Sequence, residues 1–165
     1  MKEIRYETPV ENIDWNKQTV FLAGPTVRGN QPHLTSWRNE AITLFRKMRF
    51  AGNLIIPEFK DKRESDQYRY DLPVWEFSCL QKSDVIMFWV QRTRELIGLT
   101  TNCEFGYWMA RSRMKMVYGR PDDAYRISYL DIMWVEDSKL YTYTKIDRCI
   151  HNTLARTVVA TMLKF

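Results

Sequence analysis

Short apolar runs and longer stretches of helical periodicity alternate along this chain. The run Thr19-Val-Phe-Leu-Ala23 ends at Gly24-Pro25, which is typical of a buried strand that stops at a turn. Apolar residues then recur between Trp37 and Met48 at the spacing of one face of a helix. The same reasoning predicts strands at residues 19–23, 53–57, 85–90, 114–118 and, with a weaker pattern, 140–143.

Helices are predicted between these strands. Three of them begin near Ser36, Asp71 and Thr101, a short one lies within 125–133, and the last covers 146–162. The alternation predicts an α/β fold: a flavodoxin-like, five-stranded parallel sheet with helices on both faces. We expect a single domain over residues 1–165, in which residues 1–18 form a polar N-terminal arm.

Composition narrows the range of functions. The net charge is +5, but Lys and Arg are spread along the chain, which favours a small anionic ligand over a dedicated nucleic-acid surface. The three cysteines are scattered without metal-ligand spacing, so we expect no metal site and a reducing compartment. No apolar signal core and no membrane-length segment is present. These features predict a cytoplasmic protein without membrane contact.

The most informative segment is Gly98-Leu-Thr-Thr-Asn-Cys-Glu104-Phe-Gly106, which follows an apolar run and opens a helical pattern. It places Glu104 in the expected first turn of a helix at the carboxyl end of a strand, the edge where open α/β sheets bind ligands. Thr101 and Glu104 have the spacing of a capping box, a purely structural arrangement. Alternatively, the helix dipole would keep Glu104 ionised and ready to act as a nucleophile. The motif alone leaves both interpretations open.

The parallel sheet predicts which other residues approach Glu104. The loops after the first three strands gather at one edge, so residues 24–28, 58–61 and 89–104 come together there. The helix that begins at Asp71 has its N-terminus at the same edge, so its carboxylate can face Glu104 across a pocket. Two carboxylates, one a nucleophile and one a proton donor, are what retaining cleavage of a glycosidic bond needs. Asp71 could equally cap its helix.

Several short motifs follow one another between residues 19 and 120: Phe21-Leu-Ala-Gly-Pro25, Ser36-Trp-Arg38, Ile56-Pro-Glu58, Tyr70-Asp71, Trp75-Glu76, Ser83-Asp-Val-Ile-Met-Phe-Trp-Val90 and Gly98-x-Thr-Thr-Asn-x-Glu-Phe-Gly106. In this order they resemble the nucleoside 2-deoxyribosyltransferase-like superfamily. The resemblance implies a covalent mechanism in which Glu104 attacks the anomeric carbon of a (deoxy)ribose and Asp71 helps to protonate the departing base. The transferases of the family carry an acidic residue where this chain has Gly98, and the nearest acid here is Glu95.

The expected substrate contacts come from the same loops. The loop after the first strand offers a hydroxyl, a guanidinium and free amides to an anion, and the resemblance implies that this loop can bind a 5′-phosphate. Core packing of Trp89, a solvated loop for Arg92 and a helix start for Asn102 are the alternatives. The residues assigned to substrate binding are Gly24, Pro25, Thr26, Arg28, Glu58, Trp89, Arg92 and Asn102.

We therefore expect an enzyme that cleaves or transfers the N-glycosidic bond of a (deoxy)nucleoside or nucleotide through a covalent intermediate on Glu104. For transfer it also needs a free nucleobase, and no cofactor is expected. The resemblance further implies a homo-oligomer. A non-catalytic nucleotide-binding or sensing domain is the alternative from another class. The loop after the first strand lacks G-x-G-x-x-G, which argues against a dinucleotide-dependent oxidoreductase.

Overall fold

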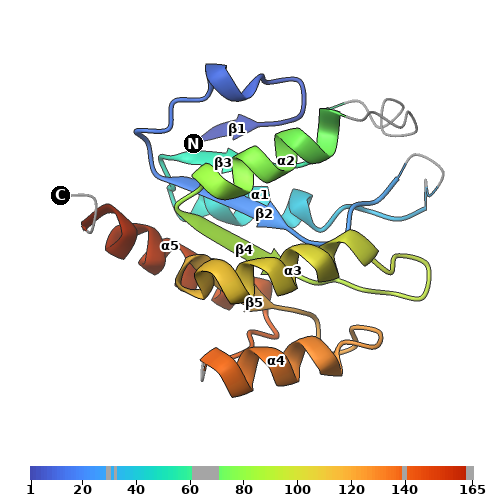
Figure 1. Cartoon of the computed structure of the whole chain (residues 1–165). Coiled ribbons are helices and arrows are strands. Elements are labelled where there is room, and N and C mark those ends of the chain that lie inside the picture. The colour runs from blue at the N-terminus through green and yellow to red at the C-terminus, as the bar shows by residue number, and fades with distance from the viewer. Residues whose placement is uncertain (29–30, 32, 61–70, 139–140, 163–165) are drawn as a thin grey trace.

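The core of the structure, a computed structural model, is a five-stranded parallel sheet (Figure 1). The residues described are 1–28, 31, 33–60, 71–138 and 141–162. The strands lie in the order β1-β3-β2-β4-β5. Their bounds are β1 Lys2–Ile4, β2 Thr19–Ala23, β3 Asn53–Ile55, β4 Val85–Trp89 and β5 Met116–Gly119.

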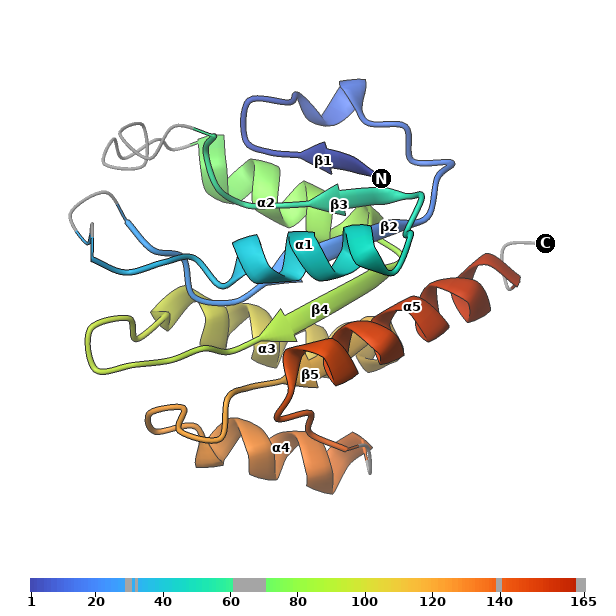
Figure 2. The ribbon, with the colours of Figure 1, turned by 180° about the vertical axis from the view of Figure 1, so that it is seen from behind.

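Helices cover both faces of this sheet. On one face α2 and α3 lie side by side (Figure 1), and on the other α1 and α5 do (Figure 2). Helix α4 packs at the β5 edge through Leu130 and Trp134, on the same side as α3. The bounds are α1 Arg38–Lys47, α2 Asp71–Lys82, α3 Leu99–Ser112, α4 Ser128–Ser138 and α5 Ile146–Met162, with 3₁₀ turns η1 Val10–Asn12 and η3 Arg113–Lys115.

Two apolar cores result, because side chains of a strand alternate between the faces of the sheet. In β2, Val20 and Leu22 join the core under α1 and α5, while Phe21 and Ala23 join the core under α2 and α3. All five residues of β2 and of β4 are buried. This explains their unbroken apolar runs, which are typical of the central strands of a parallel sheet.

The flavodoxin-like α/β fold is confirmed, with one change in where the fifth strand comes from. Strands β2 to β5 follow the flavodoxin order, but the remaining strand is β1 and pairs with β3 at the opposite edge. Part of the segment expected to be an arm is therefore sheet, and Ile4 is fully buried. A three-residue strand with one buried side chain leaves almost no periodic signal in the sequence.

The strand predicted at residues 140–143 is wrong for the described part of that range. Tyr143 forms only an isolated parallel bridge with Gly119, and residues 139–140 lie outside the described part of the chain. The other four predicted strands and all five helices are present, although α4 covers 128–138 instead of 125–133. Among the described residues, no helix is both long and apolar enough to cross a membrane.

Candidate active site at the carboxyl edge of the sheet

The order in which strands are added to the sheet reverses between the neighbouring central strands β2 and β4: β3 lies on one side of β2, and β4 and β5 lie on the other. Ligands bind at such a switch point. The loops that leave these two strands touch each other closely. Gly24 has φ +150°, and a Cβ there would lie 2.3 Å from the carbonyl oxygen of Trp89. Gly98 has φ +64°, and its Cβ would lie 2.7 Å from Pro25 Cγ. Only glycine allows both approaches without strain.

A small pocket with about 250 Å³ of empty space opens at this point. It combines residues from β2, from the loops after β2 and β3 and from three helices, and these residues run from position 21 to position 104 of the sequence. Two carboxylates and one guanidinium are among them. The lining residues are Phe21, Ala23, Gly24, Thr26, Arg38, Pro57, Glu76, Thr100 and Glu104.

Glu104 lies in the second turn of α3, not in the first as the sequence suggested. The helix begins at Leu99 with Gly98 as its N-cap, which makes no side-chain capping bond, so there is no capping box. Burial, together with repulsion from Glu76, raises the pKa of Glu104 to about 8, although Arg38 works in the opposite direction. This raised pKa contradicts the expectation that the helix dipole keeps the carboxyl ionised, because the dipole acts mainly on the first turn.

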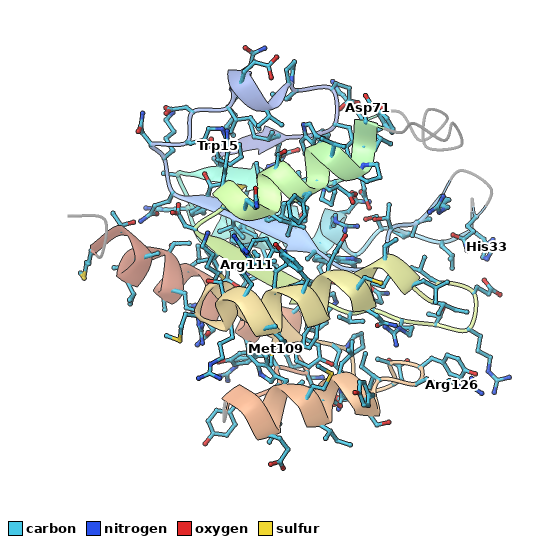
Figure 3. All side chains as sticks on the ribbon, in the orientation of Figure 1. Trp15, His33, Asp71, Met109, Arg111 and Arg126 are labelled. Carbon is cyan, nitrogen blue, oxygen red and sulfur yellow. The ribbon has the colours of Figure 1, made fainter. Side chains whose placement is uncertain are left out.

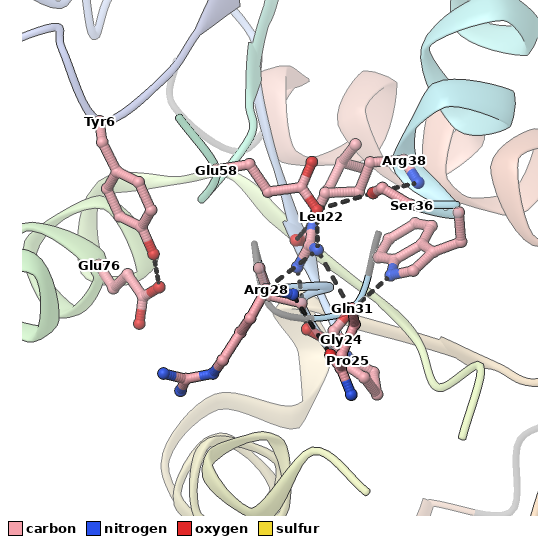
Figure 4. Close-up of polar contacts among 12 residues, drawn as sticks. Tyr6, Leu22, Gly24, Pro25, Arg28, Gln31, Ser36, Arg38, Glu58 and Glu76 are labelled. Carbon is pink, nitrogen blue, oxygen red and sulfur yellow. Dashed lines mark hydrogen bonds and ion pairs between the residues drawn. The ribbon is translucent and has the colours of Figure 1, made fainter. Parts of the chain in front are cut away.

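The second carboxylate of the pocket is Glu76, near the middle of α2. The hydroxyl of Tyr6, in the segment after β1, donates a hydrogen bond to Glu76 Oε1 (Figure 4). Burial raises the pKa of Glu76, while the Tyr6 bond and the charges of Arg38 and Arg28 act to lower it. Burial also raises the pKa of Tyr6. Tyr6 is held in place by the ring of Trp75, whose centroid lies 5.0 Å away.

Arg38, almost completely buried, fixes the shape of the loop after β2. Its guanidinium donates to five acceptors at 2.9–3.3 Å (Figure 4). Three are backbone carbonyls of β2 and its loop, one is Thr26 Oγ1, and one is Glu58 Oε1, with which it forms an ion pair. Glu58 also accepts a 2.7 Å bond from Ser36. The loop that lines the pocket is thus held by one side chain whose charge is balanced.

A second set of contacts connects the loop after β2 with the loop after β4. Gln31 Nε2 donates to the Glu95 carbonyl at 2.8 Å, and His33 Nε2 lies 2.7 Å from Glu95 Oε2. The Glu95 side chain is thus engaged by His33 on an exposed surface. Glu95 therefore connects the two loops and does not line the pocket.

Several residues assigned from the sequence do meet at the pocket. Gly24, Thr26 and Glu104 line it. Arg28 is exposed and extends from the loop toward the side on which Glu76 lies (Figure 4), and its charge lowers the pKa of that carboxyl. Pro25 lies just behind, where its carbonyl accepts from Arg38 and from Trp37 Nε1.

Other assigned residues lie elsewhere. Trp89 is a buried core side chain on the α1 and α5 side of the sheet, and Glu58 is occupied by Arg38 and Ser36. Arg92 donates to Asn102 Oδ1, and Arg92 lines a different groove. Asp71, the first residue of α2, is exposed and does not line the pocket (Figure 3).

Sequence reasoning missed Arg38, Glu76 and Tyr6 as site residues. Arg38 and Glu76 stand in two of the motifs that carry the family resemblance, so a signal for them existed. Glu76 also follows Trp75, a buried residue of α2, which places it near the sheet-facing side of the helix. No pattern singled out Tyr6. Within the described ranges, no cluster of three or more His, Cys, Asp or Glu side chains is placed to hold a metal ion.

Comparison with known proteins agrees with this geometry. The family model "Nucleoside 2-deoxyribosyltransferase like" matches residues 17–122, a range that runs from β2 through β5 and contains Arg38, Glu76 and Glu104. A search among curated proteins gives no match. The match covers well over half of the chain and includes every residue that lines the pocket, but it does not include Tyr6, the partner of Glu76. This protein therefore belongs to the nucleoside 2-deoxyribosyltransferase-like family.

Proposed function

We propose that this protein breaks the N-glycosidic bond of a (deoxy)nucleoside or nucleotide and passes the sugar to a free base or to water. Membership of the family supports a deoxyribosyltransferase-like activity. The observation that carries the more specific proposal is the meeting of Glu104 and Glu76 in one pocket at the switch point of the sheet. Retaining glycosidic cleavage needs two carboxyl groups on either side of the sugar, one ionised as the nucleophile and one that carries a proton for the leaving base.

In the first step a Glu104 oxygen attacks C1′ of the sugar, and a C–O bond forms as the C1′–N bond breaks. The electron pair of that bond goes to the base nitrogen, or to an atom conjugated with it, which takes the proton from the carboxyl group of Glu76. In the second step an acceptor nitrogen or a water oxygen attacks C1′ and gives its proton to Glu76. Glu104 then leaves as a carboxylate, and both groups return to their starting states.

The electrostatics of the pocket favour a state that shares one proton between the two carboxyl groups. Burial raises both pKa values, and the negative charge of Glu76 raises the pKa of Glu104 further, so the second proton is removed with difficulty. Tyr6 donates to Glu76, and Arg38 lowers both pKa values, so neither group is locked in its neutral form. Substrate binding then only has to favour the state in which Glu104 is ionised and Glu76 holds the proton.

The lining of the pocket indicates where the sugar would lie. Glu104 and Glu76 both line it, and the proposed chemistry needs C1′ within reach of both carboxyl groups. We therefore place the (deoxy)ribose between Glu104 and Glu76, with the base and any phosphate extending outward. Thr26 and Arg28 stand on the loop from which a 5′-phosphate would be reached.

Asp71 remains a candidate from the sequence alone. Its position on the first turn of α2, and its exposure, make it a less direct partner for Glu104 than Glu76, which lies further along the same helix. We assign the proton transfer to Glu76, and give Asp71 at most a contact with the outer part of the substrate.

The test is a chromatographic assay of the purified protein against deoxynucleosides, ribonucleosides and their 5′-monophosphates, with and without a free acceptor base. Free base formed by the wild type but not by Glu104→Gln supports the proposal, and a new nucleoside formed with acceptor identifies a transferase. If every substrate survives while some raise the melting temperature, the protein is a nucleotide-binding or sensing domain and the catalytic proposal is rejected.

A further inference from the structure

A second concave surface, which the Glu104 pocket does not use, lies at the same edge of the sheet. We call it the arginine groove. It encloses about 720 Å³ of empty space, including its open mouth, between the loop after β4 and the loop after β5. The two loops are tied by a 2.9 Å bond from the Tyr125 amide to the Arg92 carbonyl. The lining residues are Gln91, Arg92, Thr93, Arg94, Pro121, Asp123 and Tyr125.

The groove is rich in guanidinium groups. Arg92 and Arg94 line it, and both Arg94 and Arg126 stack on Tyr125, with guanidinium carbons 5.5 and 5.2 Å from the ring centroid. Asp123 is the one carboxylate among the lining residues. Arg120, by contrast, is paired with Asp131 through a 2.9 Å ion pair. Positive charge therefore exceeds negative charge in the groove itself.

Arg92 supplies the strongest indication that a ligand belongs here. Its side chain is only 6% exposed, its Nη1 donates to the Arg126 carbonyl at 3.1 Å, and its Nη2 donates to Asn102. Its Nε is buried and has no hydrogen-bond partner in the described structure. Within the described residues Arg92 also makes no ion pair. Buried donors are rarely left unpaired, and a buried cation without an anion is rarer still.

Local backbone strain points the same way. Arg126 has φ +46°, in the left-handed region that residues other than glycine seldom adopt. This conformation directs its carbonyl at Arg92 and its side chain over Tyr125 (Figure 3 shows Arg126 on the loop before α4). Strained residues of this kind persist where the surrounding structure requires them, often beside ligands.

We propose that the arginine groove binds a phosphate group, either free phosphate or the phosphate of a small ester, and does so separately from the Glu104 pocket. Guanidinium forks match the oxygens of a phosphate in geometry and charge, and Arg92 and Arg94 would hold it from one side. The two sites share no lining residue. Asn102, the partner of Arg92, and Glu104 are two positions apart on α3 and thus face directions about 200° apart.

The test is titration of ¹⁵N-labelled protein with inorganic phosphate, and separately with ribose 5-phosphate, at fixed ionic strength and pH 7. We expect saturable amide shifts at residues 91–94 and 123–126. Arg94→Gln should weaken binding about tenfold, because it removes one charge-assisted contact. Arg148→Gln, which removes an exposed arginine from α5, is the matched control and should change the affinity by less than roughly twofold.

The outcomes separate cleanly. Tighter binding of ribose 5-phosphate than of phosphate identifies an ester as the ligand, and equal affinities identify the phosphate alone. Shifts confined to residues 24–28, or an affinity that Arg94→Gln leaves unchanged, overturn the proposal, as does the absence of saturable binding. Arg92→Gln should weaken phosphate binding as well. If the Arg92→Gln variant does not fold, the affinity of Arg94→Gln alone tests the proposal. None of these results depends on turnover, so failure here leaves the glycosidic proposal intact.

Discussion

Two buried arginines at the same edge of one sheet have opposite surroundings. Arg38 is 1% exposed, and its guanidinium donates to five acceptors, one of them the carboxylate of Glu58. Arg92 is 6% exposed, donates to two neutral oxygens and leaves Nε unpaired. Both guanidinium groups are removed from water, but among the described residues only the charge of Arg38 is balanced by a carboxylate of the protein.

The difference separates a supporting residue from a binding residue. A guanidinium whose three nitrogens all donate to the protein, and whose charge is balanced by a carboxylate, positions the groups around it. A buried guanidinium that is incompletely paired favours anion binding, because an anion would supply the missing hydrogen-bond acceptor and the opposite charge. In this protein the pocket beside Arg38 contains two carboxyl groups, whereas Arg92 lies near two other arginines.

The largest effect should come from Glu104→Gln. We expect turnover to fall by at least about a thousandfold, or about 4 kcal/mol in the activation barrier, because the amide cannot act as the nucleophile. The protein should still fold, since glutamine has the same size. Comparison of initial rates and circular dichroism spectra is sufficient. Turnover close to that of the wild type would remove Glu104 from the mechanism.

Arg38→Met should destabilise the protein by about 3–5 kcal/mol, because Glu58 loses its cation and four further acceptors lose a donor. Arg92→Met should cost only about 1 kcal/mol, because it removes an incompletely paired cation. Urea unfolding of the two variants measures the contrast directly. Equal losses of stability would mean that the protein compensates the two guanidinium groups equally well.

Replacing the two carboxyl groups of α2 tests which one serves the pocket. Glu76→Gln should lower kcat about a hundredfold with substrates whose base leaves poorly, because the proton donor is lost. Asp71→Asn should change it by no more than about threefold, in line with a surface substitution. The rates of both variants should be measured on the same substrates. A larger loss for Asp71→Asn would return the catalytic role to that residue.

The last prediction concerns stability and pH. Burial raises the pKa of Glu104 from an ordinary value of 4.5 to about 8, so the folded protein retains a proton that the unfolded chain releases. Its contribution is complete below pH 4.5 and is lost as the pH rises toward 8, at up to about 1.4 kcal/mol per pH unit. Glu104→Gln should flatten this part of the urea-unfolding profile. Parallel profiles for the two proteins would show that Glu104 titrates normally.

The sequence predicted the sheet better than the site. Long apolar runs such as β4 have one plausible structure, and the helical stripes around them fix the alternation. The pocket depends on which face of a helix a polar residue occupies, and a helix start expected about one turn too late misplaced Glu104 relative to the start of α3. The start of α2 was predicted correctly, but the carboxyl group of this helix that lines the pocket is that of Glu76, further along it. The pairing of Tyr6 with Glu76 joins residues 70 positions apart, and no local pattern reports such a contact.

The edge strand β1 has a practical consequence for producing and engineering this protein. The Lys2 amide donates to the Gly52 carbonyl and the Ile4 carbonyl accepts from the Ile56 amide, at the two ends of β3, and Tyr6 follows two residues after Ile4. A variant that lacks the first six residues would expose the backbone edge of β3, and exposed strand edges promote intermolecular strand pairing and aggregation. It would also delete the hydroxyl that contacts Glu76. Trimming the first residues would therefore compromise solubility and activity together.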